Sequence, residues 1–115
     1  MEDELVRDGR VARLELRGHR SGLPRTVTVG FTEAADGTLV VAARSHGAAW
    51  ARNLEADPRA TVTIGARTFA VMAERLDDRD PRRVAAVRDL ILRYGTPSEG
   101  LGNGPVFVLS PVDRT

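Results

Sequence analysis

Alternating apolar and polar residues predict short β-strands along much of the chain. Residues 25–33 are the clearest case, because Val27, Val29 and Phe31 alternate with small or polar residues, as in a strand with one buried face. Residues 11–17 alternate in the same way, and further strands are expected at residues 38–43, 59–65, 67–76 and 106–110. Residues 34–37, Ala-Ala-Asp-Gly, are typical of a hairpin turn, and a second tight turn is expected at Gly65–Ala66.

Two segments predict helices. Ser45 can cap a helix that runs through an alanine-rich segment and ends before Pro58. Asp80 can cap a second helix, which has Pro81 at its first position and Gly95 as its stop. The apolar stripe of this second helix is expected to comprise Val84, Val87, Ile91 and Tyr94.

The order of these elements predicts the fold class. A β-β-β-α-β-β-α-β order with short connections favours a mainly β (α+β) fold, an antiparallel sheet or small barrel of about six strands with two helices. A chain of 115 residues is expected to be one domain, residues 1–115. The absence of cysteine excludes disulfides and thiolate metal sites, with a reducing cytoplasm as the default location. We find no signal peptide and no apolar run near the roughly 20 residues of a membrane span.

The charges are unevenly distributed, although the net charge is only +1. No acidic residue occurs between Glu15 and Glu33, or between Asp36 and Glu55. If residues 25–43 form one hairpin, the segments that flank it lie at the same end of the sheet, so the two acid-free windows meet. The basic residues of these windows are Arg17, His19, Arg20, Arg25, Arg44, His46 and Arg52. Together they predict a cationic surface suited to a discrete anion rather than to nucleic acid.

Each acid-free window contains a recognisable motif. The first is Gly18-His19-Arg20-Ser21-Gly22 with Arg25 three residues on, and the second is Trp50-x-x-Asn53-Leu54-x-Ala56-x-Pro58. In this order the two motifs, within roughly residues 12 to 75, resemble the deazaflavin-dependent nitroreductase family, also called F-420-dependent quinone reductases. The resemblance implies a split β-barrel related to oxidoreductases that bind flavin mononucleotide (FMN). It also implies a reduced deazaflavin, coenzyme F-420, which delivers hydride from its C5.

The resemblance and the chemistry of the residues together suggest a cofactor site. Guanidinium groups and backbone N–H groups suit the phosphodiester of F-420, and small side chains allow close approach to its flat ring. The expected cofactor-binding residues are His19, Arg20, Ser21, Gly22, Arg25, Val27, Thr28, Ala42, Ala43, Arg44, Ala49, Trp50 and Asn53. His46 and Tyr94 are candidates for contact with a small-molecule substrate. No catalytic side chain and no metal site are expected, because the cofactor carries the hydride.

Several alternatives stay open. The chain could use FMN on the same fold, or bind F-420 without catalysis. Trp50 and Tyr94 could be core residues, Asn53 a helix cap and His46 an ordinary loop residue. His19 replaces the Arg or Lys of the family turn, which weakens binding of the anionic tail or makes it pH-dependent. Because Tyr94 is the one tyrosine, the family's substrate pocket does not transfer, and an activated C=C, a quinone or a nitro group all remain candidate acceptors.

A homodimer is the expected assembly. The strand at 67–76 has apolar residues on both faces, with Phe69, Val71 and Ala73 on one and Ala70 and Met72 on the other. A strand of this kind is buried on both sides, and a second copy can cover the outer face. The alternative is that the second helix covers this face within one subunit.

Overall fold

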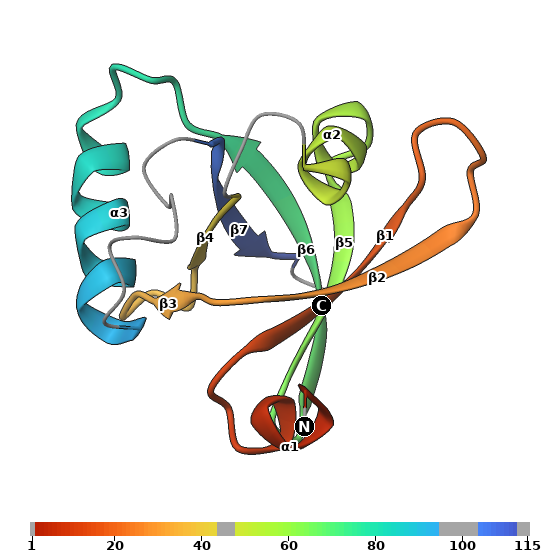
Figure 1. The fold of residues 1–115 in the computed structure, drawn as a ribbon, viewed down its shortest axis with the longest axis horizontal. Coiled ribbons are helices and arrows are strands. Elements are labelled where there is room, and N and C mark those ends of the chain that lie inside the picture. The colour runs from red at the N-terminus through yellow and green to blue at the C-terminus, as the bar shows by residue number, and fades with distance from the viewer. Residues whose placement is uncertain (1, 44–47, 95–103, 113–115) are drawn as a thin grey trace.

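The computed structural model describes residues 2–43, 48–94 and 104–112 (Figure 1). Within these residues, three helices and seven strands follow one another: α1 (Glu2–Arg7), β1 (Ala12–Arg17), β2 (Pro24–Val29), β3 (Thr32–Glu33), β4 (Leu39–Ala42), α2 (Ala49–Ala56), β5 (Arg59–Ile64), β6 (Arg67–Arg75), α3 (Pro81–Tyr94) and β7 (Val106–Pro111). The short helix α1 was not predicted from the sequence.

One sheet contains all seven strands, in the order β2-β1-β5-β6-β7-β4-β3, and curls into a half-barrel. Every neighbouring pair is antiparallel, as the sequence predicted. The two edge strands, β2 and β3, are consecutive in the chain and are joined only through Gly30 and Phe31. The chain therefore crosses from one edge of the sheet to the other, and this covalent connection spans the open side of the half-barrel.

The inner face of the curled sheet holds the main core. Residues alternate between buried and accessible along β1 and β5, which is the period expected for strands with one buried face. The fully buried side chains of this core include Leu14, Leu39, Val62, Val71, Phe107 and Leu109. A second, smaller cluster contains Leu76, Ala86 and Val106, where α3 covers the outer face of β4 and β7.

The predicted strand at 25–33 is two strands, and the predicted 25–43 hairpin is wrong. β2 pairs with β1 in the register Leu14↔Val27, whereas the two-residue strand β3 pairs with β4. β2 and β4 are not neighbours, because β1, β5, β6 and β7 lie between them in the sheet. An alternating sequence pattern does not reveal that the chain pairs with β1 before Gly30 and with β4 after it.

The helix predictions need two corrections. α2 has Ala48 as its N-cap and begins at Ala49, so the predicted Ser45 cap is wrong; Ser45 itself lies outside the described residues. In α3 the predicted stripe is correct in part: Val87 packs against the smaller cluster and Ile91 is half-buried, whereas Val84 is 70% exposed and the buried positions are Ala86 and Leu90. Helix α3 therefore contacts the sheet through Ala86, whose small side chain packs against Leu76 and Val106.

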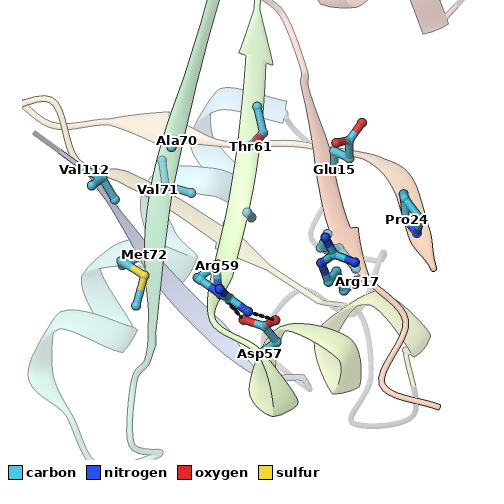
Figure 2. Close-up of a pocket in the computed structure, with 12 residues that line it drawn as sticks. Glu15, Arg17, Pro24, Asp57, Arg59, Thr61, Ala70, Val71, Met72 and Val112 are labelled. Atoms are coloured by element: carbon cyan, nitrogen blue, oxygen red, sulfur yellow. Dashed lines mark hydrogen bonds and ion pairs between the residues drawn. The ribbon is translucent and has the colours of Figure 1, made fainter. Parts of the chain in front are cut away.

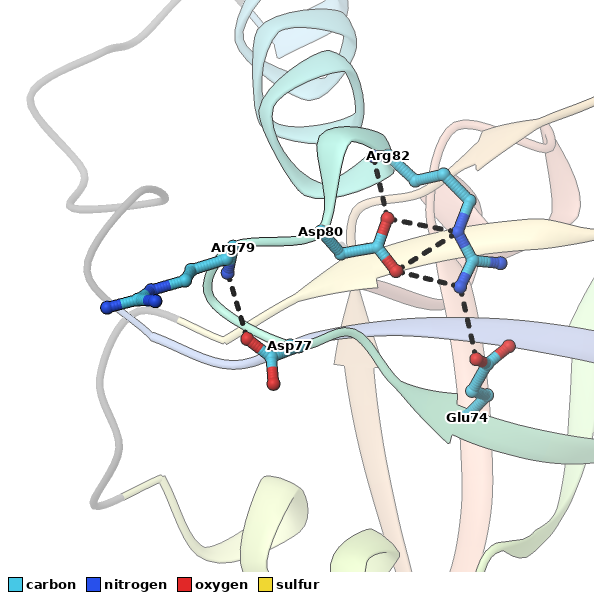
Figure 3. A network of polar contacts seen from close by, with 5 residues as sticks. All are labelled: Glu74, Asp77, Arg79, Asp80 and Arg82. Carbon is cyan, nitrogen blue, oxygen red and sulfur yellow. Dashed lines mark hydrogen bonds and ion pairs between the residues drawn. The ribbon is translucent and has the colours of Figure 1, made fainter.

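The start of α3 agrees with the prediction. Asp80 accepts a hydrogen bond of 2.9 Å from the backbone N–H of Arg82, and the Arg82 side chain also pairs with Asp80 and with Glu74 of β6 (Figure 3). The hydrogen bonds from the Arg82 side chain and backbone lower the pKa of the Asp80 carboxyl. Asp80 therefore acts as the N-cap that the sequence indicated.

Candidate functional site

The connection between β1 and β2 is a tight, glycine-dependent turn. The Gly18 N–H donates to the Leu23 carbonyl at 2.9 Å, and the Gly22 N–H donates to the Gly18 carbonyl at 2.8 Å. Gly22 has a φ of 71°, a conformation that favours glycine. A Cβ at Gly18 would lie 2.9 Å from the Ser21 hydroxyl oxygen. Residues 18–23, called the anion turn below, therefore need both glycines of the predicted motif.

The anion turn presents positive charge to solvent. Arg17 donates to the Gly22 carbonyl at 2.9 Å, which ties its guanidinium to the turn. The Ser21 hydroxyl accepts a hydrogen bond from the Leu23 N–H at 3.2 Å, which stabilises the conformation of the turn. Arg20 and Arg25 are exposed, and neither forms an ion pair with any residue that the structure describes. Two guanidinium groups without a carboxylate partner form a suitable environment for a phosphate or carboxylate ligand.

The anion turn is attached to α2 through one buried amide. The Asn53 carboxamide oxygen accepts from the backbone N–H of His19 at 2.9 Å, and it also contacts His19 Nδ1. Asn53 is only 7% exposed. This contact joins the two sequence motifs in space, so the prediction that the acid-free windows meet is confirmed, although by a different strand arrangement. Asn53 is not a helix cap, because its side chain bonds outside its own helix.

Trp50 packs on the core beside this contact. Its ring centroid lies 5.9 Å from that of Phe107, with an angle of 49° between the planes. Trp50 remains half-buried, whereas Leu54, one helical turn later, is fully buried. Trp50 therefore has both a packing role and an accessible surface, while Ala49 before it is exposed.

The other predicted site residues are divided among β2, β4 and positions outside the described residues. Val27 and Thr28 are half-buried on β2, and Val27 packs against the main core. Ala43 is buried at the end of β4, where its N–H donates to the Pro105 carbonyl at 2.9 Å. Ala42 packs against the α3 cluster instead. Arg44 and His46 lie outside the described residues, as does the side chain of Tyr94.

A groove of about 460 Å³ runs along the outer face of β1, β5 and β6, and the sequence did not predict it (Figure 2). Arg17 and Pro24 lie at the end next to the anion turn, and Met72 and Val112 line the opposite side. Asp57 and Arg59 form an ion pair of 2.9 Å in this groove. Hydrogen bonds from the Arg59 side chain and backbone lower the pKa of the Asp57 carboxyl to about 2.

The family that the two motifs resemble is supported by a match along most of the chain. Residues 4–111 match the family model described as F420H(2)-dependent quinone reductase. The chain belongs to this family. Among curated relatives, an F420H(2)-dependent quinone reductase of Mycobacterium tuberculosis is 28% identical over 71 residues, which cover 59% of this chain and 48% of that protein. The chain thus spans about half the length of the curated relatives it matches.

Solved structures share the fold of this family member. An F420-H2 dependent reductase superposes with a TM-score of 0.73 at 21% identity, covering 88% of this chain and 94% of the other. The heme storage protein HutZ from Vibrio cholerae superposes with a TM-score of 0.76 at 22% identity, covering 97% and 88%. These similarities confirm the predicted split β-barrel. A heme storage protein and a reductase share it, so the fold alone does not determine the cofactor.

Proposed function

We propose that this chain binds reduced coenzyme F-420 and uses it to reduce a small organic acceptor. Family membership supports the proposal, and the contact that carries it is the one between the anion turn and Asn53. That contact attaches the turn that carries Arg20 to α2, and a flat ring could lie there against the small and aromatic side chains of Ala49 and Trp50. The description of the family favours a quinone as the acceptor.

The residues of the site fit the cofactor. Arg20 and Arg25 would bind the phosphodiester with charge-assisted hydrogen bonds, and the anion turn would provide backbone N–H groups beside them. Ala49 and Trp50 on α2, with Val27 and Thr28 on β2, would border the ring. When bound, reduced F-420 supplies the hydride, so the protein needs to position two molecules and exclude water.

Two ligands distinguish the candidate functions. Purified protein is titrated with oxidised F-420 and, separately, with FMN, and binding is followed by fluorescence quenching. We expect saturable binding of F-420 and then oxidation of reduced F-420 in the presence of a quinone, with a nitro compound and an activated alkene as alternative acceptors. Binding of FMN alone would contradict the proposal, and F-420 binding without turnover of any acceptor would support a non-catalytic carrier.

We also propose that the chain forms a homodimer through the face that contains the outer groove. Helix α3 packs mainly against β3, β4 and β7 and meets the outer face of β6 near Glu74, which pairs with Arg82, while Met72 on the same face stays exposed. On that face Met72 is 44% exposed and Val112 is 43% exposed. The groove also contains both signs of charge, with Glu15 on β1 and Arg59 on β5. A face with apolar residues and both charges is self-complementary, as a two-fold interface requires.

Among the described residues, no helix is both long enough and apolar enough to cross a membrane.

A further inference from the structure

Asn53 is the buried polar residue of the described core, and its side-chain hydrogen bonds there are both made to His19. A buried amide oxygen needs hydrogen-bond donors, because burial without them carries a large desolvation penalty. Here the donors come from the anion turn, 34 positions earlier in the sequence. The amide is therefore placed where its hydrogen bonds connect α2 to the turn, rather than within α2.

The backbone contact determines which way the amide faces. A peptide N–H can only donate, so the atom of Asn53 that meets the His19 N–H at 2.9 Å must be the carboxamide oxygen. Rotating the amide by half a turn would set its NH2 group against the peptide N–H, with two donors facing each other. The orientation of Asn53 thus follows from the backbone alone.

The same oxygen determines the protonation of the imidazole. His19 Nδ1 also lies against the Asn53 oxygen, which offers lone pairs and no proton. The contact is attractive only when Nδ1 carries the hydrogen. Neutral His19 is then the Nδ1–H form, and its Nε2 holds the lone pair. Within the described part of the chain no hydrogen bond is formed to Nε2.

We infer that Asn53 is a positioning residue of the anion turn, which fixes the turn to α2 and holds His19 as the Nδ1–H tautomer. Nε2 is then the ring nitrogen available to a ligand, next to Arg20 in the same turn. The role in binding rests on the proposed function, whereas the tautomer follows from the contacts alone. Two measurements test the two parts separately.

Nitrogen-15 NMR of the imidazoles tests the tautomer. The chain has two histidines, so the His46→Gln variant leaves His19 as the single ring observed. Above the titration range we expect Nδ1 of His19 to carry the proton, whereas free neutral imidazole side chains favour Nε2–H. In the same background Asn53→Ala should restore the Nε2–H form, and Asn53→Asp, which retains an acceptor, should keep Nδ1–H. An Nε2–H tautomer in the protein with Asn53 intact would overturn the inference.

Binding of oxidised F-420, followed by fluorescence, tests the positioning role. We expect Asn53→Ala to raise the Kd about tenfold or more, and to raise the KM for reduced F-420 while leaving kcat near its original value. His19→Ala keeps the backbone donor and should have a smaller effect. Glu55→Ala, an exposed change on the same helix, is the matched control and should bind normally.

The possible failures are distinguishable. If the original protein binds no F-420, the proposed function fails and the NMR result still decides the tautomer. If Asn53→Ala melts cooperatively and binds F-420 as tightly as the original protein, the positioning role is wrong. If Asn53→Ala does not fold, Asn53→Asp takes its place in the NMR measurement, where loss of the Nδ1–H form would contradict the inference.

Discussion

At the scale of single residues, the arginines differ in whether they have a carboxylate partner. Arg67 forms a two-pronged ion pair with Glu33, and Arg82 pairs with Asp80 and Glu74. Arg20 and Arg25 have no such partner among the described residues. A guanidinium with a carboxylate partner contributes to the fold, whereas one without is available to a ligand.

Replacing Arg20 or Arg25 with alanine should therefore weaken F-420 binding. Each change should cost about 1.5–3 kcal/mol of binding free energy, because a charge-assisted hydrogen bond to phosphate is lost. Fluorescence titration measures the Kd. Arg79→Ala is the control, since the Arg79 side chain points away from its neighbours in Figure 3. Equal affinities for all three variants would show that the turn does not bind the anion.

Trp50 tests the division between packing and binding. Trp50→Ala should lower the free energy of unfolding by about 3 kcal/mol, because the ring packs on Phe107 and on the main core. Chemical denaturation followed by circular dichroism measures the loss, and the F-420 Kd is determined on the folded variant. If stability is unchanged and only binding falls, the ring is a pocket wall rather than a core residue.

Individual residues of the site were partly predictable. The glycines, Arg20 and Arg25 could be identified because the turn has an unusual local composition that needs no knowledge of the fold. The bond between Asn53 and His19 could not, because it depends on how the turn and α2 approach each other across the sheet. A buried asparagine in a helix is compatible with a cap, a core contact or a ligand contact, and the sequence does not distinguish them.

At the scale of elements, the end of the half-barrel opposite α2 is fixed by contacts among α1, α3 and the strands. Glu33 of β3 pairs with Arg67 of β6 at 2.9 Å, although β7 and β4 separate these strands in the sheet. Arg93 of α3 lies 4.6 Å above the Phe31 ring and donates to the Gly9 carbonyl at 3.1 Å. These contacts hold the edge strand β3 near the β5–β6 turn.

The Glu33–Arg67 pair should make stability depend on pH. The hydrogen bond from Arg67 lowers the pKa of the Glu33 carboxyl, assisted by the charges of Arg67 and Arg93. Because the pKa of Glu33 is lower in the folded protein, ionised Glu33 stabilises the fold at pH values above its pKa in the unfolded chain, about 4.3. This stabilisation is lost as the pH falls from there through the lowered pKa of the folded protein. The Tm difference between the original protein and Glu33→Gln should thus be present at neutral pH and vanish in acid. Glu4→Gln, exposed on α1 and away from the outer groove, is the control and should show no such trend.

The elements were predicted where local pattern determines them. Strands β5, β6 and β7 were found nearly to the residue, because each is a short run of β-favouring apolar residues bounded by turn or loop residues. The break between β2 and β3 was missed, because the change of strand partner at Gly30 is a property of the whole sheet. The stripe of α3 was wrong at Val84 for a similar reason, since Val84 is as apolar as Val87 and only the position of the sheet leaves it exposed.

At the scale of the whole molecule, the outer face of β1, β5 and β6 is the proposed site of dimerisation. Light scattering at micromolar concentration should give a mass of twice the 12.5 kDa of one chain. Met72→Glu should shift the mass to that of a monomer, because it places a charge among the apolar residues of the interface. Val84→Glu, at a more exposed apolar position on α3 (70% exposed, against 44% for Met72), should leave the dimer intact. A monomer that binds F-420 fully would contradict the dimer proposal.

The position of β7 has a consequence for the order in which the protein can fold during synthesis. β7 is the last described strand along the chain, yet it lies inside the sheet, between β6 and β4. Among the described strands, the β3–β4 pair joins the sheet only through β7. A nascent chain on the ribosome can therefore assemble β2, β1, β5 and β6 into one sheet. The β3–β4 hairpin is synthesised before β5, but it can join this sheet only after residues 106–111 have been made.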